Sequence, residues 1–344
     1  MILYEILLEY YKKIKIENLY YLKNKVIFIT GGNGLLGSNF ISYFHYLNNT
    51  YNMNISVIAH SYSKPLQWLP VSDNITYLNS DLKELNIDFH FDYLIHLATY
   101  GQPKKILENK LNTILLNTID YINLLEKARE NNATVLFLSS SSIYGEISQD
   151  MLPISEEKNG LIPTLALSSI YAESKRMAEV ISKIYIDDYK LNIKIIRTAI
   201  VYGPGIKAND KRFLGEFIMN ALNYNKIQLI DNGKAKRQLL FITDALEMML
   251  NCMLGGKEIL YNTAGIFSEE NNTIINIAKI IANSTQSKII LPDSDLSIEG
   301  TQSLVHLDIS KYLNEFPKRE FVSIYEGINL LINWMKKIKN NKGE

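Results

Sequence analysis

The stretch KVIFITGGNGLLG, residues 25–37, decides the fold of this chain. Its opening run of apolar and β-branched residues predicts a buried strand, and the apolar spacing after the glycines predicts a helix that ends near Leu47. In a strand–turn–helix unit of this kind, Gly31 permits the tight turn and Gly34 lets the backbone approach a pyrophosphate. Gly37 lets the helix pack closely on the strand. The stretch therefore predicts a dinucleotide site, with the phosphates at the helix N-terminus.

The same alternation of strands and helices continues to about residue 200. Short apolar runs are followed by longer stretches of helical spacing, which is typical of parallel strands joined by crossover helices. We therefore predict an α/β fold built on a doubly wound parallel sheet of the Rossmann type. Further strands are expected at 55–60, 75–81, 92–99, 134–140 and 193–200, and further helices at 111–131 and 171–189.

Beyond these strands the alternation loosens, because turn residues separate mixed helical and strand segments. We expect residues 23–200 to form the NAD(P)-binding domain, and residues 201–344 to form mainly a smaller C-terminal α/β lobe that binds the substrate. Residues 1–22 are expected to be a helical extension. Glu5 and Glu9 interrupt its apolar part, which argues against a signal peptide. Packing on the domain or on a partner subunit is favoured over attachment to a membrane surface.

The composition excludes several classes of function. Lys+Arg and Asp+Glu both number 36, so the formal net charge is zero, which argues against a general nucleic-acid binder. The single cysteine, Cys252, cannot form a disulfide within the chain, and the five histidines have no metal-ligand spacing, so no metal site is predicted. No apolar run reaches the length of about 18 residues that a membrane crossing needs. We expect a cytoplasmic protein.

Residues around the turn and the second strand are candidates for holding the dinucleotide. An acid at the end of that strand would hold the ribose 2′-hydroxyl of NAD, but none is present between residues 59 and 64. Nothing there repels a 2′-phosphate, so NADP is favoured, with NAD as the alternative. The candidates in these two segments are Asn33, Leu35, Leu36, His60, Ser61, Ser63 and Lys64.

Asp81 and Leu82 close the third predicted strand. A carboxylate at this place can accept a hydrogen bond from the adenine amino group. It can equally cap the N-terminus of the next segment. Local sequence leaves these two interpretations of Asp81 open.

A second group of residues points to redox chemistry. Tyr171 and Lys175 are four residues apart in a predicted helix, so they share one face. An ammonium beside a phenol favours the phenolate, which can pass a proton to or from a sugar hydroxyl. A run of serines, Ser139 to Ser142, lies at the end of the fifth predicted strand, where ligands bind in sheets of this type. The glycine turn, the serines and the Tyr/Lys helix together are far more specific than any one of them.

Six stretches together resemble the extended short-chain dehydrogenases/reductases of the nucleotide-sugar epimerase/dehydratase family: TGGNGLLGS, HLAT, LSSSSIYG, YAESK, RTAIVYGPG and RQLLFITDA. The resemblance runs from about Lys23 to about Lys337. It implies a Rossmann lobe, a C-terminal lobe for the nucleotide diphosphate, and hydride transfer at a sugar carbon. It also implies that Tyr171 is the acid/base, that Lys175 orients the ribose and tunes Tyr171, and that Ser140 steadies the sugar oxygen.

The resemblance further implies contacts with cofactor and substrate. Ala98 would lie beside the nicotinamide riboside, and Ser141 and Ser142 would face the substrate. Arg237 matches the diphosphate-binding arginine of the family, whose guanidinium fork suits phosphate oxygens. Arg212 is a second candidate for the substrate.

Departures from the family pattern narrow the reaction. In 4,6-dehydratases an Asp-Glu pair stands where this chain has Ser141 and Ser142, so elimination lacks its acid/base pair. Decarboxylases of UDP-glucuronate carry Glu in place of Ser142, which argues, more weakly, against decarboxylation. Ile200 replaces a phosphate-contacting Asn, and residues 295–306 lack the second diphosphate arginine. The nucleotide therefore stays open among UDP, CDP, GDP and dTDP.

Redox chemistry at one sugar carbon is what remains. A ketoreductase or dehydrogenase with exchangeable NADP is slightly favoured over a 4-epimerase with retained NAD, and surface polysaccharide synthesis is the expected setting. A non-catalytic dinucleotide sensor is the competing class, which would have no need of the Ser/Tyr/Lys set. The family commonly forms homodimers through two helices, which correspond to 111–131 and 171–189 here.

Overall fold

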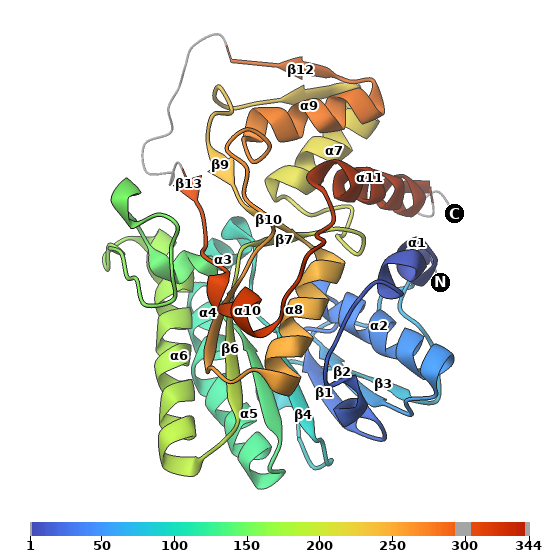
Figure 1. Ribbon diagram of the computed structural model, residues 1–344, viewed down its shortest axis with the longest axis vertical. Helices are drawn as coiled ribbons and strands as arrows, with labels where there is room; N and C mark the ends of the chain where they lie inside the picture. The colour runs from blue at the N-terminus through green and yellow to red at the C-terminus, as the bar shows by residue number, and fades with distance from the viewer. Residues whose placement is uncertain (1, 293–303, 341–344) are drawn as a thin grey trace.

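The computed structural model describes residues 2–292 and 304–340. Its centre is a seven-stranded parallel sheet with the strand order β11-β6-β5-β4-β1-β2-β3, seen near edge-on in the lower half of Figure 1. The predicted doubly wound sheet is confirmed. The strands are β1 (Val26–Thr30), β2 (Ser56–Ser61), β3 (Ile75–Asn79), β4 (Tyr93–His96), β5 (Thr134–Leu138), β6 (Ile193–Thr198) and β11 (Leu260–Thr263).

Alternation along the strands sends side chains to a separate core on each face of the sheet. Ile27 and Ile29 of β1 join one buried cluster, and Phe28 between them joins the other. Helices α2 (Leu35–Tyr51) and α8 (Ile242–Gly255) cover the first face. Helices α4 (Lys110–Asn117), α5 (Ile119–Glu130) and α6 (Ile170–Tyr189) cover the second.

Two predicted elements are divided in the structure. The single helix expected over 111–131 is two helices, because the chain breaks at Thr118, where φ is −123° and ψ is −77°. The strand expected over 193–200 ends at Thr198, and β7 (Ile200–Tyr202) pairs instead with β10 (Leu239–Phe241) outside the main sheet.

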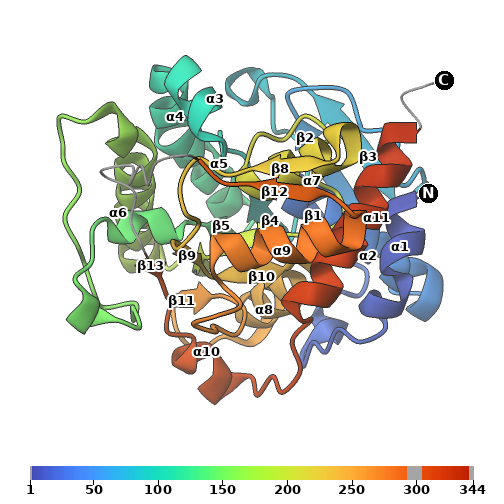
Figure 2. The ribbon, with the colours of Figure 1, turned by 90° about the horizontal axis from the view of Figure 1, so that it is seen from above.

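A smaller region lies above the carboxyl ends of the strands (Figures 1 and 2). Two further two-stranded parallel ladders belong to it, in addition to β7–β10. They pair β8 (Lys226–Gln228) with β12 (Lys288–Ile290), and β9 (Lys236–Arg237) with β13 (Leu304–Val305). Its helices are α7 (Phe213–Tyr224), α9 (Ile274–Thr285) and α11 (Ile324–Asn340), while the short helices α3 (Pro103–Glu108) and α10 (Ser310–Glu315) lie lower, beside the sheet. The main sheet also recruits β11 and α8 from beyond residue 200.

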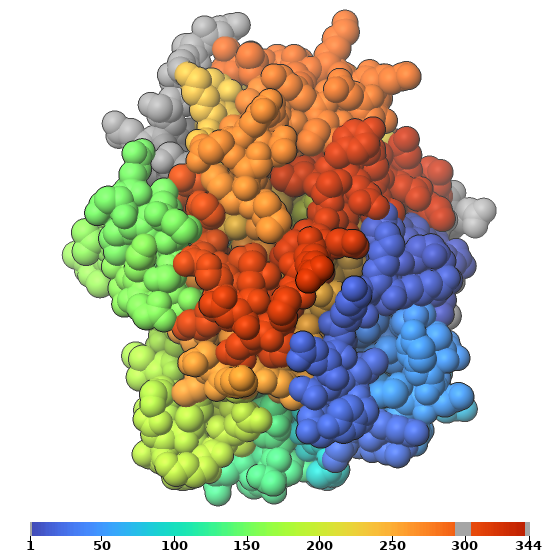
Figure 3. Space-filling view, in the orientation of Figure 1, coloured from blue at the N-terminus to red at the C-terminus, as the bar shows by residue number. Residues whose placement is uncertain are grey.

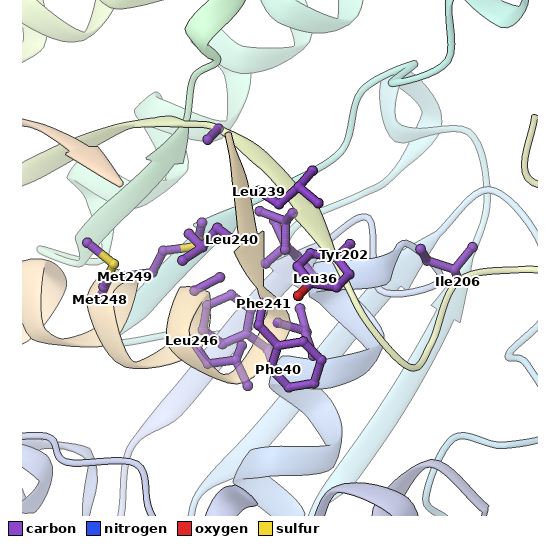
Figure 4. Packing of buried hydrophobic residues seen from close by; sticks show 14 of the residues in the cluster. Leu36, Phe40, Tyr202, Ile206, Leu239, Leu240, Phe241, Leu246, Met248 and Met249 are labelled. Atoms are coloured by element: carbon purple, nitrogen blue, oxygen red, sulfur yellow. The ribbon is translucent and has the colours of Figure 1, made fainter. Parts of the chain in front are cut away.

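The glycine-turn helix connects the two parts of the molecule. Figure 4 shows Leu36 and Phe40 of α2 packed against Phe241 of β10, together with Tyr202 of β7 and Leu246 of α8. All five side chains are buried. The helix that begins at the glycine turn is thus fixed from both the sheet and the smaller region.

The N-terminal extension is helical and packs on the domain. Helix α1 (Ile2–Tyr11) buries Leu3, Leu7 and Tyr11, which are spaced four residues apart, and it contacts α2 and α11. Figure 3 shows the blue N-terminal segment in contact with the red C-terminal one on this face. In the described part of the chain, no helix combines the length and the hydropathy that a membrane crossing needs.

Candidate active site

The glycine turn follows β1, which lies between β4 and β2, where the strand order reverses. Gly31 has φ +78°, and a Cβ on it would lie 2.9 Å from the backbone nitrogen of Ala98. A Cβ on Gly37 would lie 2.3 Å from the carbonyl oxygen of Gly31. Gly34 precedes the first turn of α2, where the N–H groups have no carbonyl partner within the helix. This close, donor-rich cradle fits a pyrophosphate, with Leu35 and Leu36 in the helical turn that faces it.

Asn33 ties the glycine turn to the loop after β2. Its backbone N–H donates to Ser61 Oγ at 2.8 Å. Its side-chain amide donates to the Ser63 carbonyl and hydroxyl and to the Lys64 carbonyl, each at 2.9 Å. The structure therefore brings Asn33, Ser61, Ser63 and Lys64 together, as a cofactor loop requires. The amide of Asn33 is engaged by this loop.

His60 is held by the segment that follows β3. Its imidazole is buried, and Nε2 lies 3.1 Å from the Ser80 carbonyl oxygen. A contact between this side chain and the cofactor stays a prediction. The sequence carries no acid in this loop, and the structure places the Lys64 side chain in solvent.

Asp81 caps the short 3₁₀ helix 82–84. Its carboxylate accepts a hydrogen bond from the backbone N–H of Lys83 at 3.4 Å and lies 3.3 Å from the Lys83 ammonium. The capping interpretation of Asp81 is therefore realised. Leu82 begins that helix and is half-buried. Contacts of either residue with an adenine stay a prediction.

A buried polar chain fixes the backbone beside the turn. The Ala98 N–H donates to Thr30 Oγ1 at 3.3 Å, and the same oxygen lies 2.7 Å from His96 Nδ1. Burial holds the pKa of His96 well below its ordinary value, and the charge of Lys175 acts in the same direction. A neutral imidazole thus joins the ends of β1 and β4. Thr30 and His96 were not selected from the sequence, because both lie within ordinary apolar strands.

Tyr171 and Lys175 lie on the first turns of α6, beside the end of β5. The Lys175 ammonium donates to the Leu138 carbonyl at 2.8 Å and lies 4.6 Å from the centre of the Phe137 ring. Burial lowers its pKa to about 7, and the carboxylate of Glu179 acts in the opposite direction. Burial raises the pKa of Tyr171, against which a hydrogen bond with Ser140 acts.

Ser140 follows β5 and holds the start of the next turn. Its Oγ accepts the Ser142 N–H at 3.1 Å and lies 3.1 Å from Ser142 Oγ. The same hydroxyl lies near enough to Tyr171 to lower the pKa of the phenol. Ser141 and Ser142 begin a 3₁₀ turn and are half-buried and exposed, respectively.

The two candidate arginines lie in different settings. Arg212 precedes α7 and forms a forked ion pair with Asp210, with Nη2 2.6 Å from Oδ2. Its charge also lowers the pKa of Tyr171, so it lies near this candidate catalytic residue. Arg237 is on β9, where burial lowers its pKa. Its Nη1 donates to the Lys236 carbonyl at 2.8 Å. In the described part of the chain, no three His, Cys, Asp or Glu side chains gather to hold a metal ion.

Asn117 is a buried polar residue beside this site that sequence reasoning missed. It ends α4 at the helix break, and its amide donates to Ser174 Oγ at 3.1 Å and to Thr99 Oγ1 at 3.3 Å. Its Oδ1 is buried and has no hydrogen-bond partner among the described residues. The only signal in the sequence is an Asn in an apolar helical run.

The chain is similar in sequence to curated proteins and in fold to solved structures. UDP-glucuronic acid decarboxylase 1 of Xenopus tropicalis is 24% identical over 75% of this chain, which covers 59% of that protein. UDP-glucuronic acid decarboxylase 6 of Arabidopsis thaliana is 26% identical over 91% of this chain and 89% of its own length. The first curated relatives are thus longer, and the chain spans about three fifths of them.

Solved structures show the same fold. The epimerase Mth375 of Methanothermobacter thermautotrophicus superposes with a TM-score of 0.80 at 19% identity, covering 95% of this chain and 96% of its own. UDP-N-acetylglucosamine 4-epimerase of Methanobrevibacter ruminantium superposes with a TM-score of 0.76 at 22% identity, covering 92% and 99%. The sequence model of the NAD dependent epimerase/dehydratase family matches residues 27–263. The chain belongs to that family.

Proposed function

We propose that this protein transfers a hydride between a nicotinamide dinucleotide and a hydroxyl-bearing carbon of a nucleotide-diphosphate sugar. The observation that carries the proposal is the convergence of Ser140, Tyr171 and Lys175 at the end of β5. Ser140 lies near enough to Tyr171 to lower the pKa of the phenol, and Lys175 is buried one helical turn away. A dinucleotide-binding sensor would have no use for this set.

The residues support proton transfer at a sugar oxygen. When bound, the dinucleotide supplies or accepts the hydride. Tyr171 takes the hydroxyl proton in the oxidative direction and returns it in the reductive one. Ser140 donates a hydrogen bond to the same oxygen. The Lys175 ammonium favours the phenolate of Tyr171, in opposition to the burial that raises the pKa of the phenol.

The neighbouring side chains limit the reaction to this redox step. Ser141 and Ser142 offer no carboxylate at the turn after Ser140. Elimination needs an acid and a base at adjacent carbons, and neither serine can serve. The resemblance places Glu at the position of Ser142 in decarboxylases, so decarboxylation is also disfavoured for this chain.

The cofactor determines which of two reactions follows. The loop after β2 has no acid to hold a ribose 2′-hydroxyl, and Lys64 is exposed there. This favours exchangeable NADP and a ketoreductase or dehydrogenase. The name of the family favours NAD, and the likeness to a solved 4-epimerase favours a 4-epimerase, which would retain that cofactor. Dissociation constants for the two dinucleotides decide between the cofactors, and a clear preference for NAD would reject NADP.

Arg237 and Arg212 are proposed to bind the diphosphate. A guanidinium can pair with two phosphate oxygens, and both side chains lie in the region above the strand ends. Arg212 would have to exchange part of its bond with Asp210 for the substrate. Binding of UDP, CDP, GDP and dTDP, measured by thermal shift, identifies the nucleotide.

Turnover is tested with keto-sugar nucleotides, nucleotide sugars and UDP-glucuronate. Net consumption of NAD(P)H at 340 nm indicates a reductase, epimerised product without net consumption indicates an epimerase, and released CO₂ would reject the redox-only assignment. Tyr171→Phe should lower kcat by about a thousandfold and keep dinucleotide binding, since it removes only the proton-transfer group. Tyr189→Phe, an exposed tyrosine on the last turn of the same helix, is the control. Near-normal activity of Tyr171→Phe would refute its role.

A further inference from the structure

The helix face that carries the catalytic pair continues to a buried carboxylate. Glu179 follows Lys175 by four residues, as Lys175 follows Tyr171, so the three lie along one face of α6. Glu179 Oε1 accepts a hydrogen bond from Ser139 Oγ at 2.5 Å. Ser139 immediately precedes Ser140 in the chain. The carboxylate is therefore bonded to the strand end that carries the active-site serine.

Arg197 of β6 fixes this carboxylate in place. Its Nε lies 3.0 Å from Oε1 and its Nη2 lies 2.6 Å from Oε2 of Glu179. The side chains are only 8% and 12% exposed, respectively. The remaining Nη1 of Arg197 donates to Tyr144 Oη at 3.1 Å and to the Glu156 carbonyl at 2.8 Å. Because the guanidinium of Arg197 is bound on both sides, it restricts the carboxylate of Glu179 to one position. Burial reduces the solvent screening of the carboxylate charge.

Lys175 lacks a direct counter-ion of its own. Its hydrogen-bond acceptor is the neutral carbonyl of Leu138, and no carboxylate of the described chain lies within 4.0 Å of its nitrogen. The titratable groups that face it are Tyr171 and Glu179 on α6 and His96 on β4. Burial keeps His96 neutral, and Glu179 is the group whose charge favours the ammonium.

Glu179 has its own charged and titratable neighbours. Arg197 of β6 pairs with it, Tyr121 of α5 feels its charge, and Lys183 follows it by one turn on α6. Lys183 is paired instead with Asp187 at 2.5 Å in solvent. The fixed pair of Glu179 and Arg197 is thus the charged group nearest the buried side of Lys175.

We propose that Glu179, held by Arg197, is a positioning residue that fixes the strand end beneath Ser140 and maintains Lys175 as an ammonium. The effect of Glu179 on the charge of Lys175 depends on the folded structure alone. Its consequence for turnover rests on the proposed function. The two charges of the pair act on Lys175 with opposite signs. Removing either one therefore gives a different result from simple loss of packing.

The proposal is tested by following Lys175 directly through the ¹³Cε chemical shift of labelled lysine, assigned by its loss in Lys175→Arg. In Glu179→Gln the acceptor for Ser139 stays but the charge is lost, so the pKa of Lys175 should fall by about 0.5–1 unit. In Arg197→Gln a positive charge is lost, so the pKa should rise. Both variants weaken the same network, so damage to the fold cannot produce shifts of opposite sign.

Asp187→Asn is the matched control, since it removes an exposed carboxylate from the same helix. It should leave the Lys175 titration unchanged. An unchanged Lys175 pKa in Glu179→Gln, or shifts of the same sign in Glu179→Gln and Arg197→Gln, would overturn the proposal. If Glu179→Gln does not fold, the sign of the shift in Arg197→Gln decides.

The consequence for turnover has a separate readout. The protonated fraction of Lys175 is lost as the pH rises through its pKa, so the alkaline limb of the kcat profile should move to lower pH in Glu179→Gln. At pH 7.5 kcat should fall about three- to eightfold, with KM little changed. A shifted Lys175 pKa in a protein that turns over no nucleotide sugar would reject the proposed function and leave the assignment of Glu179 intact.

Discussion

At Gly37 the addition of a single methyl group should weaken cofactor binding while the chain still folds. A Cβ there would lie 2.3 Å from the Gly31 carbonyl oxygen and 2.7 Å from Gly32 Cα. Both contacts are with backbone of the glycine turn itself, so Gly37→Ala must open the turn. We expect the dissociation constant for NAD(P) to rise at least about tenfold and stability to fall by about 1–3 kcal/mol.

Isothermal titration with both dinucleotides, together with urea unfolding, checks this expectation. Gly101→Ala is the control, since its Cβ would meet nothing within 4 Å. That variant should bind and unfold like the parent protein. Unchanged dinucleotide binding by Gly37→Ala would mean that the turn is not the pyrophosphate cradle.

At this scale the sequence pointed to candidate residues whose own chemistry fits a reaction. Tyr171 and Lys175 were selected by their spacing on one helix and Ser140 by the family resemblance, and the structure places all three near the end of β5. Glu179, Arg197 and the other supporting residues could not be predicted. Their partners lie on other strands and helices, and an isolated charged residue in a helix more commonly faces solvent.

A buried ion triad joins α8 to the segment that precedes α11. The Lys318 ammonium lies 3.0 Å from Asp244 Oδ1 and 3.0 Å from Glu247 Oε1, and all three side chains are less than one tenth exposed. Burial raises the pKa of both carboxyls, and Lys318 acts against that shift. Lys318→Met leaves two buried carboxylates without this cation. The loss of stability near pH 8 should be about 3–5 kcal/mol.

The same variant should be less impaired at pH 5. A carboxyl whose pKa is raised in the folded state binds more protons there than in the unfolded chain, so its stability contribution is lost as the pH rises. Lys318→Met raises both pKa values further and steepens this loss. Urea unfolding at pH 5 and pH 8 measures it, with Lys183→Met on the exposed surface as the control. An equal loss at both pH values would contradict the electrostatic account.

The local sequence pattern was enough to predict most strands and helices of the main sheet. It was not enough to predict which strands pair with one another. The strand from residue 26 and the helix from residue 35 follow directly from apolar spacing and glycine positions. The pairing of β11 with β6 could not be predicted, because no hairpin turn marks two parallel strands as neighbours. More than 60 residues of chain separate Thr198 from Leu260 in sequence. The break at Thr118 was hidden since helical spacing continues on both sides of it.

Over the whole molecule, an exposed apolar face lies where α4 and α6 pack side by side. These helices cover the sheet with their inner sides, and Figure 2 shows α6 at the molecular margin. Large apolar side chains remain exposed on the outer sides of both helices, although folding usually buries side chains of this type. They are Leu111, Ile114, Leu115, Met177, Val180 and Ile184, with exposed fractions from 39% to 74%.

A second copy is the partner that this face fits. A face shared by two helices can meet its own copy across a two-fold axis, which brings like side chains together without unpaired charges. The family resemblance named residues 111–131 and 171–189 for such a contact, and these ranges include α4 and α6. We therefore expect a homodimer in solution.

Val180→Glu should convert this dimer into a monomer. The side chain is 55% exposed near the middle of α6, so a carboxylate there costs nothing in the free chain but would be buried against its copy in the dimer. Sedimentation equilibrium at micromolar concentration should give twice the chain mass for the parent protein and the single mass for the variant. Val71→Glu, at a 91% exposed position away from these helices, should remain dimeric. A monomeric parent protein would rule out the dimer. A dimeric Val180→Glu would place the contact elsewhere.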